Sequence, residues 1–215
     1  MSVGSTEKGL LTPTNCAVVF LDHQPHVYDD VGLEVRQELL NAVLVLAKAA
    51  QIFQVPVIIT ALESGPVGGE ITPQLLEVFP AIRPIKRSCI NAWDDPEFVA
   101  AVRATHRRNI LISALWCETS LVFPAVQMLE EGFGIYAVED ASASKNTATR
   151  LAAIRRIEQA GAVSLTALQA LLELQRDWSR HDHSSEVLGV LKEHYAMARK
   201  PQLIPQSPST TRNHS

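Results

Sequence analysis

The sequence predicts an α/β fold in which a parallel β-sheet carries helices on both faces. Short, nearly continuous apolar runs alternate about six times with longer segments that have helical spacing or helix-end signals. Buried parallel strands and the helices that cover them produce this alternation. The 215 residues are also enough for one large domain with a sizeable core, so a second domain is not required.

The first half of the chain supplies three strands. Residues 16–21 form an apolar run that ends at Asp22, and residues 33–53 repeat apolar side chains at helical spacing. A second strand is predicted at 55–60. The turn-rich residues 63–69 follow it, and we expect them to form a lid or a subunit contact. Residues 82–85 are predicted to be a weak strand because Pro84 interrupts them.

The second half continues the same order. A helix is predicted over residues 94–106, with acidic residues in its first turn, and a buried strand over 110–115 feeds the next helix near residue 119. Glycines flank the start of a strand at 135–138, and Gly161 ends a helix over 147–159. A short strand at 162–165 and a helix at 168–178 complete the sheet and its cover.

Composition excludes several functional classes. The net charge of −4 and the scattered basic residues do not predict a nucleic-acid-binding surface. The N-terminus has no long apolar run, so we expect neither a signal peptide nor a membrane span. The three cysteines lack Cys-x-x-Cys spacing, which argues against a disulfide framework and a zinc site. We therefore expect a cytoplasmic protein without a metal or cofactor that acts on a small molecule.

The C-terminal region suggests both a partner surface and a tail. Val187, Leu188, Val190 and Leu191 are predicted to form an apolar helix face that remains after the sheet is covered, which favours a homo-oligomer. Residues beyond about 199 are rich in Pro, Ser and Thr and lack the apolar content to pack. We expect one domain over residues 10–198 and a flexible tail over 199–215.

The turn after the strand at 110–115 is the first candidate for chemistry. It carries Trp116, Cys117, Glu118, Thr119 and Ser120 at the sheet edge where open α/β proteins bind ligands. A thiol at a helix N-terminus is favoured as thiolate, which would make Cys117 reactive. Alternatively, Thr119 or Ser120 caps the helix and Cys117 is a small buried hydrophobe.

Two other strand ends bring polar side chains to the same edge. Asp22 follows the first strand, and Lys86 and Arg87 follow the weak strand. A carboxylate can take a proton from a nucleophile while a cation stabilises negative charge, so these residues together predict a catalytic site. Each residue taken alone also fits a structural role, either as a turn cap or as a solvated charge.

Three motifs resemble the isochorismatase-like cysteine hydrolases, most closely the YcaC-type branch. They are residues 21–24 (LDHQ), 90–95 (INAWDD) and 115–125 (LWCETSLVFPA), and the resemblance extends over about residues 14–180. It implies a three-layer α/β/α Rossmann-like fold with six mainly parallel strands. It also implies oligomers and hydrolysis of amide-like C–N bonds through an Asp-Lys-Cys triad. Asp22 matches the acid or base of that triad.

The other two triad positions depart from the family pattern. The lysine position falls on Arg87, with Lys86 one residue away, and an arginine does not shuttle protons. An ungapped alignment of the family turn places Ser120 at the nucleophile position and Cys117 at the position of a threonine. Glu118 and the Phe-Pro-Ala helix start at residues 123–125 match the family pattern on either side of Ser120 and favour this register.

Three functions are compatible with these residues. Cys117 or Ser120 acts as nucleophile in a hydrolase; or an acid acts without a thiol, as in the vinyl-ether hydrolases of the family; or the fold serves only for binding. His23 is the nearby histidine that a serine nucleophile would need as base. Substrate contacts are predicted for five residues: Gln24, Asn91, Trp93, Trp116 and Glu118.

Overall fold

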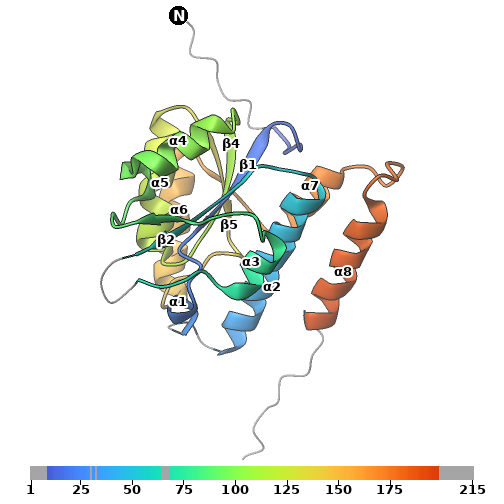
Figure 1. Ribbon diagram of the computed structural model, residues 1–215, viewed down its shortest axis with the longest axis horizontal. Coiled ribbons are helices and arrows are strands. Elements are labelled where there is room, and N and C mark those ends of the chain that lie inside the picture. Colours follow the sequence, from blue (N-terminus) through green and yellow to red (C-terminus); the bar gives the residue numbers. More distant parts are fainter. Residues whose placement is uncertain (1–8, 30, 32, 64–67, 199–215) are drawn as a thin grey trace, which may run out of the picture.

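The computed structural model describes residues 9–29, 31, 33–63 and 68–198 (Figure 1). Six strands pair in parallel in the order β3-β2-β1-β4-β5-β6, which confirms the predicted fold class. The strands are β1 (Cys16–Leu21), β2 (Val57–Leu62), β3 (Ile85–Arg87), β4 (Asn109–Ala114), β5 (Gly134–Val138) and β6 (Val163–Leu165).

Helices cover both faces of this sheet (Figure 1). The α-helices are α1 (Pro25–Asp29), α2 (Leu33–Ile52), α3 (Pro73–Val78), α4 (Pro96–Ala104), α5 (Val122–Glu130), α6 (Thr147–Ala160), α7 (Ala167–Gln175) and α8 (Ser184–Ala198); two short turns are η2 (Ala92–Asp94) and η3 (Cys117–Leu121). Helices α2, α3, α7 and α8 pack with one hydrophobic cluster, and α4, α5 and α6 pack with the other.

Alternate side chains along each strand belong to different clusters. Val18 and Phe20 of β1 belong to the cluster beneath α2, whereas Ala17 and Val19 belong to the cluster beneath α4 and α5. Successive residues of a strand point to opposite faces, so a strand covered on both faces must be apolar throughout. This requirement explains why β1 is fully buried along its length.

The strand order places one edge of the sheet at a topological switch point. The chain moves outward from β1 to β2 and β3, then returns to pair β4 with the other side of β1. Ligands of open α/β sheets bind beyond the carboxyl ends of the strands at such a point. The segments that follow β1 and β4, where α1 and η3 lie, are therefore the expected location of a functional site (Figure 1).

Two predicted strand boundaries were displaced by proline. The strand expected at 55–60 is β2 at Val57–Leu62, and the weak strand expected at 82–85 is β3 at Ile85–Arg87. Pro56 and Pro84 each immediately precede the strand rather than interrupt it. Proline lacks a backbone N–H and is tolerated at the start of a strand, which explains both shifts.

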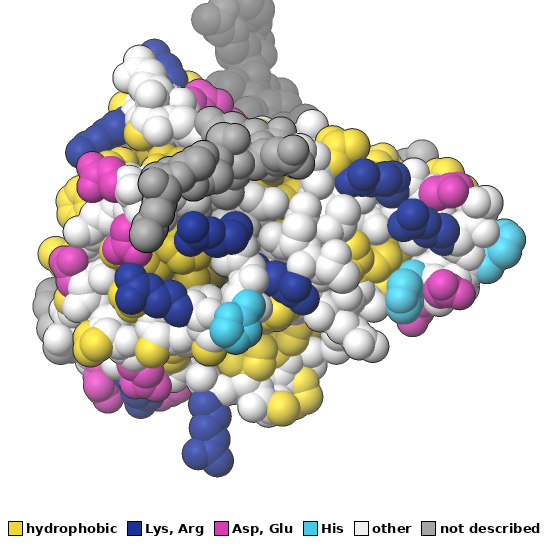
Figure 2. Space-filling view, turned by 90° about the horizontal axis from the view of Figure 1, so that it is seen from above, with side chains coloured by type: hydrophobic (Ala, Val, Ile, Leu, Met, Phe, Trp, Pro, Cys, Tyr) yellow, Lys and Arg dark blue, Asp and Glu magenta, His cyan; other side chains and the backbone are white. Residues whose placement is uncertain are grey.

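The expectation of a free apolar face on α8 was wrong for two of its four residues. Val187 and Val190 are buried in the cluster beneath α2, so they serve this chain's own core. Leu191 is partly buried and packs against the same cluster. Leu188 remains 45% exposed, and with Leu191 and Tyr195 it lines a groove along α8. Figure 2 shows the α7–α8 end of the molecule projecting from the main body.

Two of the expectations, the flexible tail and most of the lid, concern residues outside the described part of the chain. The tail at 199–215 and most of the proposed lid, residues 64–67, fall outside the described part of the chain. Within the described part, no helix combines the length and the hydropathy that a membrane span requires.

Candidate active site

Three buried side chains meet where β1, β3 and the η3 turn end. The Ser120 hydroxyl donates a hydrogen bond of 2.6 Å to Oδ2 of Asp22. The Arg87 guanidinium donates to the same carboxylate oxygen and forms a buried ion pair with it. Asp22 and Ser120 are 0% exposed and Arg87 is 1% exposed. We call these three residues the Asp22 cluster.

Arg87 is held in place by neutral acceptors as well as by Asp22. Its Nε donates to the Thr60 hydroxyl at 3.2 Å, and its Nη1 donates to the carbonyl oxygens of Cys89 and Ile90. Four of its five N–H groups therefore have acceptors. This arrangement fixes the position of a positive charge beside Asp22.

The environment makes Asp22 more basic than an ordinary aspartate. Burial penalises the charged carboxylate and raises the pKa of Asp22, while the Arg87 charge and the Ser120 hydrogen bond oppose this shift. Among the described residues, the second carboxylate oxygen, Oδ1, meets no donor in good hydrogen-bond geometry, although the Leu62 N–H lies near enough to the carboxyl to oppose the rise of its pKa. One oxygen thus accepts two hydrogen bonds and the other accepts none of comparable geometry.

The backbone around the cluster adopts uncommon conformations. Asp22 has a φ of 60° immediately after β1, and its carbonyl oxygen accepts a hydrogen bond of 2.8 Å from the Gln24 amide. Trp116 has a φ of 57° before the π-type turn η3. Positive φ is rare for residues other than glycine and is frequent at functional sites. These turns orient Asp22 and Ser120 toward each other.

Cys117 does not join the cluster. Its side chain is 0% exposed, and its thiol donates to the Ala143 carbonyl oxygen at 3.2 Å. Burial raises the pKa of Cys117 to about 12, which opposes the thiolate that a helix dipole would favour and supports the alternative interpretation of Cys117 as a small buried side chain. Because η3 separates Cys117 from the start of α5, desolvation determines the pKa instead.

Lys86 and Arg87 occupy very different environments. The Lys86 amine is exposed and lies 3.7 Å from Glu63 and 3.8 Å from Glu70, whereas Arg87 is buried beside Asp22. Successive side chains of β3 point in opposite directions, which separates the two cations. Lys86 therefore does not contact Asp22 in this structure.

His23, the histidine considered as base for Ser120, is engaged elsewhere. Its Nδ1 lies 2.9 Å from the Tyr28 hydroxyl and its Nε2 lies 2.9 Å from the Ser113 hydroxyl. Ser113 in turn donates to the Ala141 carbonyl oxygen, so it accepts from His23. Burial lowers the pKa of His23 to about 4, which keeps the ring neutral. Asp22, rather than His23, is the group that contacts Ser120.

Two of the five residues predicted to contact substrate, Asn91 and Trp93, use their polar side-chain atoms in hydrogen bonds within the protein. Asn91 caps η2 by accepting from the Trp93 amide and donates to Gln127. The Trp93 indole donates to Glu131 at 2.8 Å, and its ring contacts Phe98 and Phe133 in the core. Neither residue contacts the Asp22 cluster.

Two more of these residues stabilise loops. Glu118 accepts a hydrogen bond of 2.6 Å from Ser144. Gln24 bonds to Leu62 and Gly69 through both ends of its amide. Trp116 differs because its indole Nε1 is buried and has no hydrogen-bond partner among the described residues.

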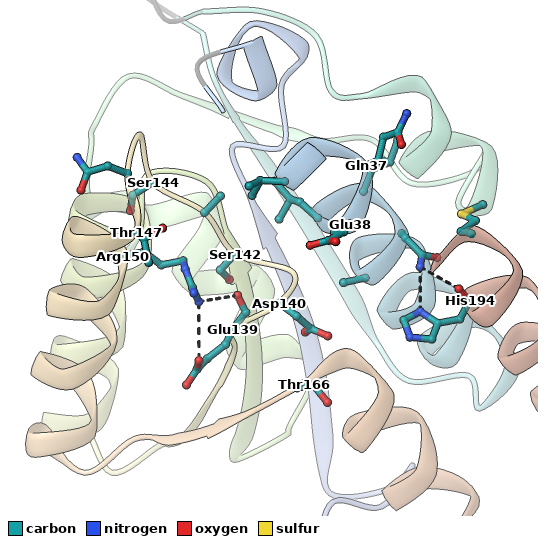
Figure 3. A pocket seen from close by; sticks show the side chains of 18 residues that line it. Gln37, Glu38, Glu139, Asp140, Ser142, Ser144, Thr147, Arg150, Thr166 and His194 are labelled. Carbon is teal, nitrogen blue, oxygen red and sulfur yellow. Dashed lines mark hydrogen bonds and ion pairs between the residues drawn. The ribbon is translucent and has the colours of Figure 1, made fainter. Parts of the chain in front are cut away.

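A cavity of about 830 Å³ lies beyond the carboxyl end of β5, and Figure 3 shows its lining. Two of its lining residues, Ala143 and Ser144, accept from Cys117 and donate to Glu118 of the η3 turn, respectively. Arg150 and Glu139 form an ion pair on one side of it, and Asn41 bonds to His194 on the other. Its lining includes none of the three Asp22-cluster residues. Cavity volume alone would therefore direct attention away from the cluster.

Sequence reasoning missed Thr60 and His26. Thr60 is a buried polar residue in β2, and its hydroxyl accepts a hydrogen bond from Arg87. A hydroxyl in an otherwise apolar strand is the signal that could have identified it. The Nε2 atom of His26 is buried without a partner among the residues described here. No spacing rule in the sequence distinguishes His26 from a surface histidine.

Comparison with known proteins places this geometry in a family. Residues 16–169, more than half of the chain, match the model of the isochorismatase domain. The chain belongs to the isochorismatase family. The probable hydrolase YcaC of Escherichia coli is 38% identical over 170 residues, which cover 78% of this chain and 81% of that protein. The resemblance inferred from the three motifs is thereby confirmed, and the chain is a YcaC-like member of this family of hydrolases.

Solved structures of family members have the same fold. YcaC from Pseudomonas aeruginosa, determined with hexane-2,5-diol and covalent acrylamide, superposes with a TM-score of 0.79 at 34% identity, covering 89% of this chain and 96% of that one. The Escherichia coli YcaC structure, described as an octameric hydrolase of unknown specificity, gives a TM-score of 0.75 at 33% identity and covers 87% and 97%.

Proposed function

We propose that this protein hydrolyses small amide-like C–N bonds, with Ser120 as nucleophile and Asp22 as its base. The observation that carries the proposal is the 2.6 Å hydrogen bond from the Ser120 hydroxyl to the Asp22 carboxylate. A hydroxyl is a weak nucleophile until a neighbouring base accepts its proton. Burial raises the pKa of Asp22, which improves that base.

The reaction follows from this contact. The Ser120 oxygen attacks the amide carbon while its proton passes to Asp22, and a tetrahedral intermediate forms. The C–N bond then breaks as Asp22 returns the proton to the leaving nitrogen, which leaves an acyl ester on Ser120. Water attacks the ester with Asp22 again accepting a proton, and the C–O bond to Ser120 breaks as the hydroxyl regains that proton.

Arg87 supplies charge and not proton transfer. An arginine side chain does not shuttle protons, so Arg87 is neither the base nor the acid of these steps. The contacts to Thr60, Cys89 and Ile90 keep it beside Asp22. In this role Arg87 holds the carboxylate in place and offsets the negative charge of the site.

The family comparisons support hydrolysis but do not name a substrate. Escherichia coli YcaC is described as a hydrolase of unknown specificity. The covalent acrylamide in the Pseudomonas aeruginosa YcaC structure does not identify an amide substrate, because acrylamide forms covalent adducts through its alkene and keeps its amide. The small amide-like substrate is the one that the family resemblance implies. The vinyl-ether alternative is less well supported, because Oδ2 of Asp22 accepts two hydrogen bonds and so resembles a base more than an acid.

A second candidate, a binding protein without catalysis, is favoured by one observation. All three cluster side chains are 0–1% exposed, so a substrate reaches Ser120 only if the covering segments move. If the protein only binds, the buried pair of Asp22 and Arg87 stabilises the fold and has no catalytic role. The two candidates differ in whether the protein turns over any amide.

The test is ammonia release from a panel of small primary amides, including acrylamide, with and without iodoacetamide treatment. The untreated protein is expected to release ammonia. Brief treatment should not affect it, because Cys117 is buried and its pKa is raised to about 12. Ser120→Cys is expected to retain turnover within about tenfold and to become sensitive to iodoacetamide, because the path that admits an amide substrate to position 120 also admits this small amide, and a thiol is the more reactive nucleophile.

Cys117→Ala is the matched control and should behave as the unmodified protein. Loss of turnover in Cys117→Ala, together with inactivation of the unmodified protein by iodoacetamide, would show that Cys117 is the nucleophile and would reject the assignment of Ser120. Failure to release ammonia from any amide of the panel would reject the hydrolase proposal in favour of the binding candidate.

We also propose that the chain forms a homo-oligomer in the cytoplasm. Escherichia coli YcaC is described as octameric, and Leu188, Leu191 and Tyr195 line an outer groove on α8. All three cysteines are free thiols, as a reducing compartment favours. Light scattering is expected to give a multiple of 23.6 kDa. A mass of a single chain at working concentration would contradict the assembly.

A further inference from the structure

The cavity of about 830 Å³ beyond the carboxyl end of β5 has the size of a small-molecule binding site, since such sites usually enclose about 300–1,000 Å³. Helix α2 forms one wall, residues 139–144 and the start of α6 form the opposite wall, and the end of α8 lies to one side (Figure 3). None of the Asp22-cluster residues lines it. A ligand here would therefore occupy a second site on the same edge of the sheet.

The charged side chains of this cavity do not balance. Arg150 on α6 lies 3.8 Å from the Glu139 carboxylate and donates to the Glu139 carbonyl oxygen at 3.5 Å, so these two charges offset each other. Glu38 on α2 and Asp140 after β5 form no ion pair with any described residue. Figure 3 shows both side chains extending into the space between the two walls. The described residues thus leave two carboxylates of the cavity without a counter-ion.

Asp140 is partly buried, whereas Glu38 is exposed. Oδ1 of Asp140 accepts a hydrogen bond of 2.8 Å from the Ala167 amide. Burial raises the pKa of the Asp140 carboxyl, while the hydrogen bond from Ala167 and the charge of a protonated His194 oppose the rise. A cation bound beside Asp140 would favour the ionised carboxylate and offset the cost of its burial.

Asn41 adds a neutral acceptor to the wall formed by α2. Its side chain is 8% exposed, and its Nδ2 lies 2.9 Å from Nδ1 of His194 and donates to the His194 carbonyl oxygen at 3.4 Å. These contacts leave Oδ1 of Asn41 without a donor among the described residues. The amide oxygen of a largely buried side chain takes its donor from water or from a ligand.

This lining suits an organic cation better than a metal ion. In the described part of the chain, no group of three or more His, Cys, Asp or Glu side chains is placed to hold a metal ion. The apolar part of the lining comprises Val35, Leu39, Leu40, Ala42, Ala143 and Met197. An aliphatic chain with ammonium groups can pack on these side chains and still reach the carboxylates.

We propose that this cavity is a binding site for a small aliphatic diamine in its doubly charged form. One ammonium group pairs with Asp140 and the other with Glu38, and the carbon chain lies against the aliphatic side chains of α2. The proposal is independent of the hydrolysis proposed for the Asp22 cluster, because no residue of that cluster takes part in it.

Calorimetry with three probes of equal chain length tests the charge of the ligand. Butane-1,4-diamine, butane-1,4-diol and succinate are titrated into the full-length protein at constant ionic strength. The diamine should bind saturably, with one equivalent per chain. The diol has no charge and succinate has the opposite charge, so both should bind at least about tenfold more weakly.

Substitutions that remove only charge test the two carboxylates. Asp140→Asn keeps the oxygen that accepts from Ala167 and should raise the diamine Kd at least about tenfold, as expected for a lost hydrogen bond to a charged group. Glu38→Gln should raise it about two- to fivefold, because exposed ion pairs are weaker. Glu97→Gln is the control: it removes an exposed carboxylate from α4, on the other face of the sheet, and should not change the Kd.

Arg150→Gln should change the diamine Kd in the opposite direction. The substitution releases Glu139 from its ion pair and adds a third uncompensated carboxylate to the lining, so the Kd should fall about two- to fivefold. A general disturbance of the fold would weaken binding instead. Weaker binding by Arg150→Gln would therefore contradict the proposal.

Nuclear magnetic resonance of the histidine rings locates the ligand. His194 lines the cavity, so the diamine should shift the ring signal that His194→Gln removes. The signal that His183→Gln removes should stay in place, because His183 pairs with Glu186 on the surface. Equal binding of the three probes, an unmoved His194 signal or an unchanged Kd in Asp140→Asn would overturn the proposal. Absence of saturable diamine binding, as expected if a second copy of the chain covers the cavity, would also overturn it.

Discussion

Asp22→Asn is expected to lower amide turnover by at least about a hundredfold. The substitution preserves size but removes the carboxylate to which the Ser120 hydroxyl donates. Because this carboxylate is the base of the proposed reaction, its loss should cost about 10² to 10⁴ in rate. Ser120→Ala should reduce turnover to a similar residual level. The two residues act on one proton, so the double variant should be no slower than the slower single variant.

The pH profile of turnover provides a second readout of Asp22. The carboxylate must be ionised to act as base, and burial raises its pKa above the usual value of an aspartate. Turnover should therefore fall on acidification with a midpoint higher than that of an ordinary aspartate. Initial rates across the acid range measure this midpoint.

Activity of Asp22→Asn within a few-fold of the unmodified protein would contradict the base assignment. A circular dichroism spectrum and an unfolding curve for each variant separate loss of chemistry from loss of fold. This control is needed because Asp22→Asn also leaves Arg87 without its buried counter-charge.

Arg87→Met is expected to lower the free energy of unfolding by about 3–5 kcal/mol, the usual cost of removing one partner from a buried ion pair. Asp22 would remain fully buried without its cation. The Thr60 hydroxyl and the Ile90 carbonyl oxygen would also lose the donor that now satisfies them. Urea unfolding followed by circular dichroism gives the change directly.

Lys86→Met is the matched control, because it removes a cation from the adjacent position of the same strand. Its amine is exposed and lies 3.7–3.8 Å from its carboxylate partners, so the expected change is at most about 1 kcal/mol. The double variant Asp22→Asn/Arg87→Met should be less destabilised than the sum of its two singles. Equal effects of Lys86→Met and Arg87→Met would show that the buried pair does not stabilise the fold as argued.

Sequence alone determined the architecture, because its signals are local. Each strand buried on both faces must be apolar along its length, as in β1 and β4, and the intervening helices repeat at their own period. Gly161 ends α6 with a φ of 109°, which is a conformation that glycine adopts readily. The ungapped motif match also placed Ser120 and Arg87, not Cys117 and Lys86, at the family positions.

The tertiary structure alone decided which of these side chains meet. Residues 86 and 87 are neighbours in sequence, but the pairing of Leu62 with Arg87 in the sheet directs Arg87 inward and leaves Lys86 exposed. The winding of η3 sets Ser120 toward Asp22 and Cys117 toward Ala143. The Nε2 atom of His23 is hydrogen-bonded to Ser113, which lies 90 positions away in the sequence, and not to Ser120. These outcomes depend on contacts between distant segments, and the direction and burial of a side chain follow from such contacts rather than from its position along the chain.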